Sequence, residues 1–194
     1  MGHRLKFVMF SALLAAVLLP HPAHAAREKG FTVVAAIIKD ESAGMFSEPA
    51  SLFFDEAKKR MYVADTLNNR LVSFDNDFRY LAELSHENFA MPMAVARTSA
   101  GEFFIVDGKT NEMKLVDVQN KVIKPFVIKG LPPAMEKFIP GRFSMDNDER
   151  IYVIDRLNRR IVVVDRDGNF IRAVSPPKRQ SGGRVFYGFN DFRV

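Results

Sequence analysis

The sequence predicts an all-β protein of the β-propeller class, built from four-stranded antiparallel blades, and two observations lead to this prediction. A hydrophobic run ending in Asp, a polar turn and a second hydrophobic run ending in Asp occur three times in the 194 residues. The two aspartates of each copy are ten positions apart, and the first aspartates, Asp65, Asp107 and Asp155, are 42 and 48 positions apart. Repeats of about 40 to 50 residues made of β-hairpins are typical of propeller blades.

The chain begins with residues 1–25, which have the layout of a secretory signal peptide. Basic Arg4 and Lys6 precede an apolar run of thirteen residues that ends before Pro20, and small residues surround the cleavage site expected after Ala25. The run is shorter than the roughly 20 residues of a membrane-spanning helix. We therefore expect the segment to be removed, no stable membrane span to remain, and the protein to be exported to the periplasm or the cell exterior. Retention of the segment as a membrane anchor stays open.

Residues 26–44 are expected to hold an N-terminal strand, in the apolar stretch Phe31–Ile38, and the lead-in to the first blade. The blades are expected at 45–84, 85–128 and 129–177, with a partial blade at 178–194. Each begins with a strand after a proline that lies 15 or 16 positions before the first aspartate, namely Pro49, Pro92 and Pro140. Turn-forming residues separate this strand from the next. The fourth strands are predicted at Tyr80–Leu84, Lys124–Ile128 and Phe170–Val174.

Two of the three turns share a pattern of polar residues. Asp, Asn and Arg recur at fixed spacing, as Asp65, Asn68 and Arg70 in the first copy and as Asp155, Asn158 and Arg160 in the third. This pattern resembles the repeat of the NHL family of β-propellers. The second copy departs from the pattern, because Gly108 follows its Asp and Thr110 and Glu112 replace the Asn and the Arg. The resemblance covers roughly residues 45–194.

The resemblance implies a ring of usually six blades, whereas the sequence predicts three blades and the first strand of a fourth. The prediction is therefore an incomplete ring of a six-bladed propeller. Two explanations stay open: the sequence is part of a longer six-bladed protein, or short chains assemble into a closed ring.

The repeated turns are predicted to be structural. A carboxylate at the end of a strand accepts hydrogen bonds from backbone N–H groups two or three residues on, and Asn tolerates the left-handed backbone of a tight turn. This interpretation assigns scaffold roles to Asp65, Asn68, Asp107, Asp155 and Asn158. The alternative is a ring of polar groups that faces a ligand on one surface.

Basic residues in the third copy are candidates for binding an anionic partner. Arg156, Arg159 and Arg160 share one turn, and Arg70 occupies the corresponding turn of the first copy. The partner would be a cell-envelope polysaccharide, an acidic protein surface or lipid headgroups. The alternative is a solvated turn with local ion pairs. Without the two cations of the signal segment, 26 basic residues stand against 23 acidic ones, a charge of +3. This mild excess argues against a dedicated nucleic-acid binder.

The available side chains predict a binding or scaffolding module for protein or cell-envelope ligands rather than an enzyme. Cysteine is absent, and His86 is the single histidine outside residues 1–25. A multi-histidine zinc site, as in the amidating lyases of similar fold, is therefore not expected. No catalytic residue, metal or cofactor is predicted.

The alternative function is a metal-dependent hydrolase of the lactonase-like six-bladed type, with part of its site in further blades. Its oxygen ligands would be Asp146, Asn147 and Asp148, or Glu48. These residues are also ordinary hairpin-turn residues, which is the interpretation we favour.

Overall fold

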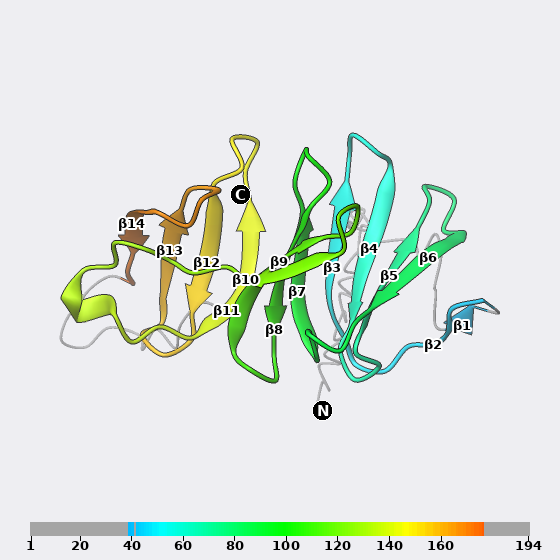
Figure 1. Ribbon diagram of the computed structural model, residues 1–194, viewed down its shortest axis with the longest axis horizontal. Helices are drawn as coiled ribbons and strands as arrows, with labels where there is room; N and C mark the ends of the chain where they lie inside the picture. Colours follow the sequence, from blue (N-terminus) through cyan, green and yellow to red (C-terminus); the bar gives the residue numbers. More distant parts are fainter. Residues whose placement is uncertain (1–38, 41, 177–194) are drawn as a thin grey trace, which may run out of the picture. The chain divides into compact units, whose positions relative to one another are not determined.

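The described part of the chain is all-β. The computed structural model describes residues 39–40 and 42–176, so the signal segment, the strand expected at Phe31–Ile38 and the partial blade expected at 178–194 lie outside the described residues. Within them, three four-stranded antiparallel sheets follow one another along the chain, and in each sheet the strands lie in chain order (Figure 1). This is the architecture of propeller blades, as the sequence predicts.

We call the three sheets blades 1, 2 and 3. Blade 1 contains β3 (Pro49–Asp55), β4 (Arg60–Asp65), β5 (Arg70–Phe74) and β6 (Tyr80–Ser85). Blade 2 contains β7 (Pro92–Arg97), β8 (Phe103–Asp107), β9 (Glu112–Asp117) and β10 (Val122–Pro125). Blade 3 contains β11 (Pro140–Met145), β12 (Ile151–Asp155), β13 (Arg160–Val164) and β14 (Phe170–Val174). The short pair β1 (Lys39–Asp40) and β2 (Gly44–Met45) precedes blade 1, and a 3-10 turn, η1 (Pro133–Met135), precedes blade 3.

The middle strands of each blade carry apolar residues on both faces, and most of these side chains are buried. β8 and β13 are buried along their whole length. Branched and aromatic side chains suit a pleated sheet that packs on two sides. In all three blades the first aspartate of the repeat ends the second strand, and it pairs with the first residue of the third strand: Asp65 with Arg70, Asp107 with Glu112, and Asp155 with Arg160.

The fourth strand of blade 2 differs from the prediction. It was expected at Lys124–Ile128, but β10 covers Val122–Pro125. Residues after β10 instead follow blade 2 and then reach blade 3. Phe126 donates its amide hydrogen to the carbonyl of Met113 (2.8 Å), and Lys129 bridges to Asn169. The Phe126 bond continues the pairing with β9 just past β10, and the chain then leaves blade 2 for blade 3, a change of direction that the apolar run of the sequence does not indicate.

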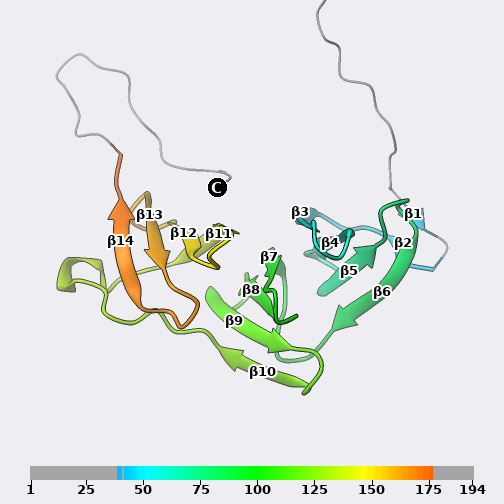
Figure 2. The ribbon, with the colours of Figure 1, turned by 90° about the horizontal axis from the view of Figure 1, so that it is seen from above.

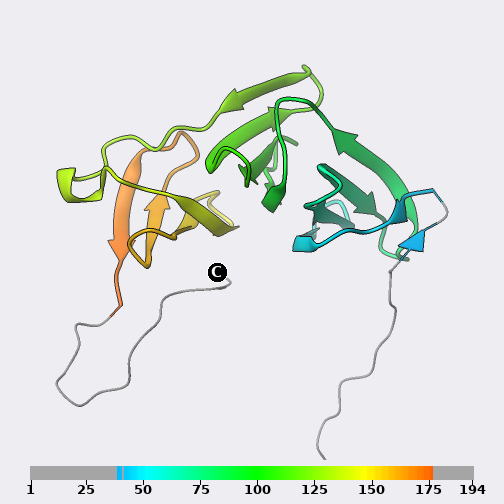
Figure 3. The ribbon, with the colours of Figure 1, turned by 90° about the horizontal axis from the view of Figure 1, so that it is seen from below.

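Neighbouring blades bury apolar side chains between their faces. Between blades 1 and 2, the rings of Tyr62 and Phe103 meet edge to face at 5.0 Å, within a cluster that includes Ala64, Leu71 and Ile105. Between blades 2 and 3, Phe104, Val106 and Met113 pack with Ile151, Val153, Val162 and Val164. β7 contacts both β3 and β11, while β6, β10 and β14 form the far edges of their sheets (Figures 2 and 3).

Gly168 is required where blade 3 meets the segment that follows β10. Its φ is +84°, and a Cβ there would lie 2.4 Å from the carbonyl oxygen of Val127. We expect Gly168→Ala to lower the free energy of unfolding by about 1–3 kcal/mol, because it combines backbone strain with the loss of the Lys129 bridge. Urea unfolding measures this loss. The matched control is Gly130→Ala, at φ +70° with nothing within 4 Å, where only the backbone strain applies; an equal loss in both variants would contradict the clash.

Candidate functional site

The repeated turn of blade 1 is built around the buried carboxylate of Asp65. Its Oδ1 accepts a hydrogen bond from the amide of Ser47 (2.7 Å), and its Oδ2 accepts bonds from Asn68 Nδ2 and Arg70 Nε (both 2.8 Å). Asn68 Nδ2 and Arg70 Nη2 also donate to the carbonyl of Met45 (2.9 and 3.3 Å). The carboxylate therefore ties the turn to the segment that enters the blade, and its charge is balanced by charge-assisted hydrogen bonds.

Blade 3 repeats this arrangement around Asp155. Asp155 Oδ1 accepts hydrogen bonds from the amides of Leu157 and Asn158 (3.1 and 3.2 Å), and Oδ2 accepts bonds from Asn158 Nδ2 and Arg160 Nε (2.8 and 2.9 Å). Asn158 Nδ2 also donates to the carbonyl of Lys137 (2.8 Å), just as Asn68 donates to the lead-in of blade 1. In both blades the Asn and Arg side chains of the repeat donate hydrogen bonds to the buried Asp carboxylate.

In blade 2, Lys114 supplies the cation that the repeat pattern lacks. Lys114 Nζ lies 2.5 Å from Asp107 Oδ2 and donates to the carbonyl of Asn88 (2.6 Å). Glu112 occupies the position of the Arg, and Lys114 lies two residues further along β9 on the same face of the strand. Motif spacing did not reveal this residue. A lysine between the apolar residues Met113 and Leu115 in the interior of a strand was the available indication.

The environment of Asp107 favours its ionised form. Burial raises the cost of the charge, but hydrogen bonds from Lys114 and from the amides of Thr110 and Ala90 outweigh it and hold the pKa of Asp107 below its usual value. Blade 2 thus has the charged carboxylate of Asp107 at the buried position of Asp65 and Asp155, but its cationic partner is a lysine instead of an arginine.

The turns of neighbouring blades lie on the same edge of the sheets (Figure 1) and are joined by hydrogen bonds. The bonds are Thr66 Oγ1 to the carbonyl of Pro92 (2.8 Å), the Met91 amide to Asn69 Oδ1 (2.9 Å) and Arg156 Nη1 to Asn111 Oδ1 (3.4 Å). The buried aspartates and these links hold the turns in fixed positions, so that the edge is a pre-formed surface.

The four arginines named as binding candidates fall into two groups. Arg70 and Arg160 lie beneath the turns of blades 1 and 3, largely buried and paired with the aspartates. Arg156 and Arg159 are exposed in the turn of blade 3, and Arg159 adopts a left-handed φ of 54°. The structure therefore does not bring all four together in one exposed patch. Leu157, between the two exposed arginines, is itself 49% exposed.

The aspartates considered as metal ligands take part in a tight turn. Asp146 accepts hydrogen bonds from Arg150 Nε (2.8 Å) and the Tyr152 hydroxyl (3.0 Å), and Arg150 Nη2 donates to Asp148 (2.7 Å). Burial opposes the charge of Asp146, but the hydrogen bonds it accepts from Arg150 and from the Tyr152 hydroxyl lower its pKa. Over residues 39–40 and 42–176, no three His, Cys, Asp or Glu side chains gather in a way that would hold a metal ion.

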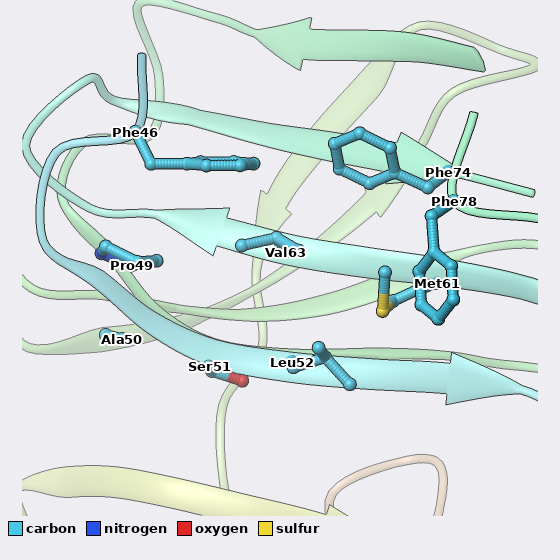
Figure 4. Close-up of a pocket in the computed structure, with 9 residues that line it drawn as sticks. All are labelled: Phe46, Pro49, Ala50, Ser51, Leu52, Met61, Val63, Phe74 and Phe78. Carbon is cyan, nitrogen blue, oxygen red and sulfur yellow. The ribbon is translucent and has the colours of Figure 1, made fainter. Parts of the chain in front are cut away.

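An apolar groove of about 460 Å³ lies on one face of blade 1 (Figure 4). This is the face opposite to Tyr62, Ala64 and Leu71, which pack against blade 2. Leu52 is 61% exposed and Phe78 41% exposed in this groove, whereas Val95, the counterpart of Leu52 in blade 2, is buried against blade 1. The lining residues are Phe46, Pro49, Ala50, Ser51, Leu52, Met61, Val63, Phe74 and Phe78. Within the described part of the chain, no helix is long and apolar enough to cross a membrane.

The three blades and their repeated aspartate turns define a protein of the β-propeller class. Solved structures of similar fold include a putative gluconolactonase (TM-score 0.55, 10% identity, 72% of this chain and 51% of that chain). A chain of a nidogen/laminin complex matches with a TM-score of 0.50 at 16% identity, over 68% of this chain and 48% of that one. A virginiamycin B lyase from Staphylococcus aureus matches at 14% identity over 68% of this chain and 42% of that one; its TM-score of 0.48 carries no further argument.

At these identities the likeness shows the fold alone. The chain spans about half the length of each of these structures or less. No protein-family model matches the sequence, and no curated protein matches it.

Proposed function

We propose that the protein is an exported β-propeller of NHL type that binds an anionic partner, an acidic protein or a cell-envelope polymer, through the edge that carries the aspartate turns. The spacing of Asp65, Asn68 and Arg70, repeated in blade 3, supports the NHL assignment. The layout of residues 1–25 supports export to the periplasm or the cell exterior. Assembly with further copies to close a ring is compatible with this proposal.

The observation that carries the binding proposal is the rigid turn of blade 3, which presents Arg156 and Arg159 on either side of exposed Leu157. Asp155 fixes the turn from below, so little conformational entropy is lost when a partner binds. Cations beside an apolar side chain suit a partner surface that combines carboxylates with apolar contacts.

Replacing Arg156 and Arg159 together by Ala is expected to weaken binding to acidic polymers about tenfold, since two charge contacts that together contribute about 1.4 kcal/mol are lost. Binding of labelled poly-L-glutamate and polygalacturonate, followed by fluorescence anisotropy at fixed salt, measures the change. The matched control is Lys58→Ala with Arg79→Ala, which removes the same charge from the opposite edge of blade 1. If the control variant weakens binding equally, the effect comes from net charge alone, and the proposal is contradicted.

A second candidate is a metal-dependent hydrolase of lactonase-like type, which the fold likeness to a putative gluconolactonase favours. Part of its site would lie outside the described residues. Calorimetric titration with Ca²⁺ and Zn²⁺ tests it, and absence of binding heat at millimolar metal would remove this candidate.

A further inference from the structure

A small pocket lies where the repeated turn of blade 2 meets the segment that connects blades 2 and 3. Its volume is about 230 Å³. Asn111 and Glu112 line it from the turn, and Phe126, Glu136 and Phe138 line it from the connecting segment. Small-molecule sites usually have volumes of roughly 300–1,000 Å³. The pocket is therefore of a size that suits one side chain of a binding partner.

The length of the connecting segment creates this pocket. β10 ends at Pro125 and β11 begins at Pro140, whereas β6 ends at Ser85 and β7 begins at Pro92. The longer segment packs apolar side chains against the core between blades 2 and 3. They are those of Phe126, Ile128, Leu131 and Phe138. The apolar part of the pocket is thus held by the core and is formed before a partner binds.

Two carboxylates, those of Glu112 and Glu136, line the same pocket. Both residues are exposed. The structure gives neither side chain a hydrogen bond or an ion pair with another of the described residues. Arg70 and Arg160 occupy the position of Glu112 in blades 1 and 3, so the charge at this position has the opposite sign in blade 2. The pocket therefore combines apolar walls with a negative charge.

We infer that this pocket binds a basic side chain, arginine or lysine, of a protein partner. Both side chains join an apolar stem to a charged head. In the pocket, the stem lies against the apolar residues of the connecting segment, and the head meets the carboxylates of Glu112 and Glu136 in charge-assisted bonds. The aromatic residues Phe126 and Phe138 add a favourable contact for a cation.

The pocket adjoins the exposed arginines of blade 3. Asn111 lines the pocket and accepts a hydrogen bond from Arg156 (3.4 Å). A partner that covers both places presents a basic side chain beside carboxylates, and these carboxylates offset the repulsion between Arg156 and the basic side chain. A polypeptide carries both kinds of group, whereas polygalacturonate carries carboxylates alone. The inference rests on the proposed binding of an anionic partner at this edge, and it specifies an acidic protein with a basic residue in its binding segment.

The test uses two labelled peptides of glutamates with one central residue, arginine in one peptide and alanine in the other. Net charge favours the alanine peptide, which carries more negative charge, whereas the pocket favours the arginine peptide. We expect the unaltered protein to bind the arginine peptide about tenfold more tightly, as measured by fluorescence anisotropy at fixed salt. Glu112→Gln combined with Glu136→Gln is expected to abolish this preference, because the pocket keeps its shape and loses its charge.

The matched control is Glu48→Gln combined with Glu87→Gln. It removes the same charge from exposed glutamates that precede β3 and β7 and lie outside the pocket. The control variant is expected to keep the preference for the arginine peptide. Melting temperatures verify that both double variants are folded.

The outcomes separate this inference from the proposed function. A preference of the unaltered protein for the alanine peptide would overturn the pocket, as would a preference for the arginine peptide that survives in Glu112→Gln with Glu136→Gln or that is lost equally in the control. If the unaltered protein binds neither peptide, the proposed function fails.

In that case the pocket is judged alone, by titration of N-acetylarginine methylamide into protein with isotope-labelled methionine methyl groups. Met113 lines the pocket and is 3% exposed, so its methyl signal reports on occupancy. A saturable shift of this signal that is lost in Glu112→Gln with Glu136→Gln would support the site, and absence of a shift in the unaltered protein would overturn it.

Discussion

Replacing Lys114 by Val is expected to lower the free energy of unfolding by about 3–5 kcal/mol, because it leaves the carboxylate of Asp107 buried without its cation. The Asp107 side chain is 2% exposed, and Lys114 is its ion-pair partner. Val is chosen because Val72 and Val162 occupy the same strand position in blades 1 and 3. The packing is therefore expected to tolerate the substitution. Urea or thermal unfolding followed by circular dichroism measures the loss.

A second substitution tests the reason for that loss. Combining Lys114→Val with Glu112→Arg gives blade 2 the arrangement of blades 1 and 3, in which an Arg opposite the Asp supplies the charge. The double variant is expected to recover most of the stability, whereas Glu112→Arg alone brings no comparable gain. Such non-additivity is the mark of two residues that share one partner. If the double variant is as unstable as Lys114→Val, the cause is packing rather than the charge of Asp107.

The same pair determines a pH dependence. The folded-state pKa of Asp107 is lowered, so its contribution to stability is fully present above the unfolded-state value of about 3.9 and is lost as the pH falls through the folded-state value. We therefore expect the stability difference between the unaltered protein and Lys114→Val to shrink as the pH is lowered below about 4. A difference that stays constant down to pH 2 would contradict the assignment.

Truncating Phe104 to Ala is expected to cost about 3–5 kcal/mol, because its ring fills the interface between blades 2 and 3. Phe104 is fully buried in the cluster with Val106 and Met113, and its ring meets that of Phe126 edge to face at 4.8 Å. In repeat proteins each unit is stabilised by contacts with its neighbours. Hydrogen exchange is therefore expected to accelerate most in blade 3, whose face rests on this interface.

The control for this prediction is Phe54→Ala in blade 1. Phe54 is 39% exposed, so its truncation removes the same atoms with far less loss of packing. We expect a loss below about 1 kcal/mol for this variant. If both variants are destabilised equally, the interface between blades 2 and 3 does not contribute as its contacts indicate.

The aspartate repeat was sufficient to predict the blades, because strand periodicity and turn chemistry are local properties of the chain. Asp65 and Asp155 end the second strand of their blades at the expected residues. The partner of Asp107 was not predictable in the same way. Lys114 does not occupy the Arg position of the repeat. Its amine reaches the Asp107 carboxylate because Lys114 lies on the same face of β9 as Glu112, the residue opposite Asp107.

The candidate binding arginines show the same difference between what the sequence predicted and what the structure decided. The sequence placed Arg70 and Arg160 in one group with Arg156 and Arg159, because all belong to the repeated turns or adjoin them. Whether the buried arginine forms a second ion pair depends on the facing strand, where blade 1 has Glu83, which pairs with Arg70, and blade 3 has Ala173. These residues lie thirteen positions from the arginine in each blade, and no spacing rule of the turn includes them.

By itself, the sequence determined the fold class, the number of described blades and the place of each aspartate turn, since each follows from alternating apolar residues and from turn residues close together in the chain. The tertiary structure alone decided which side chain neutralises each buried carboxylate and which arginines of the repeated turns are buried and paired. The physical reason is that burial and charge compensation depend on groups that meet across strands, and their free energies are set by distance in space rather than by spacing in the chain.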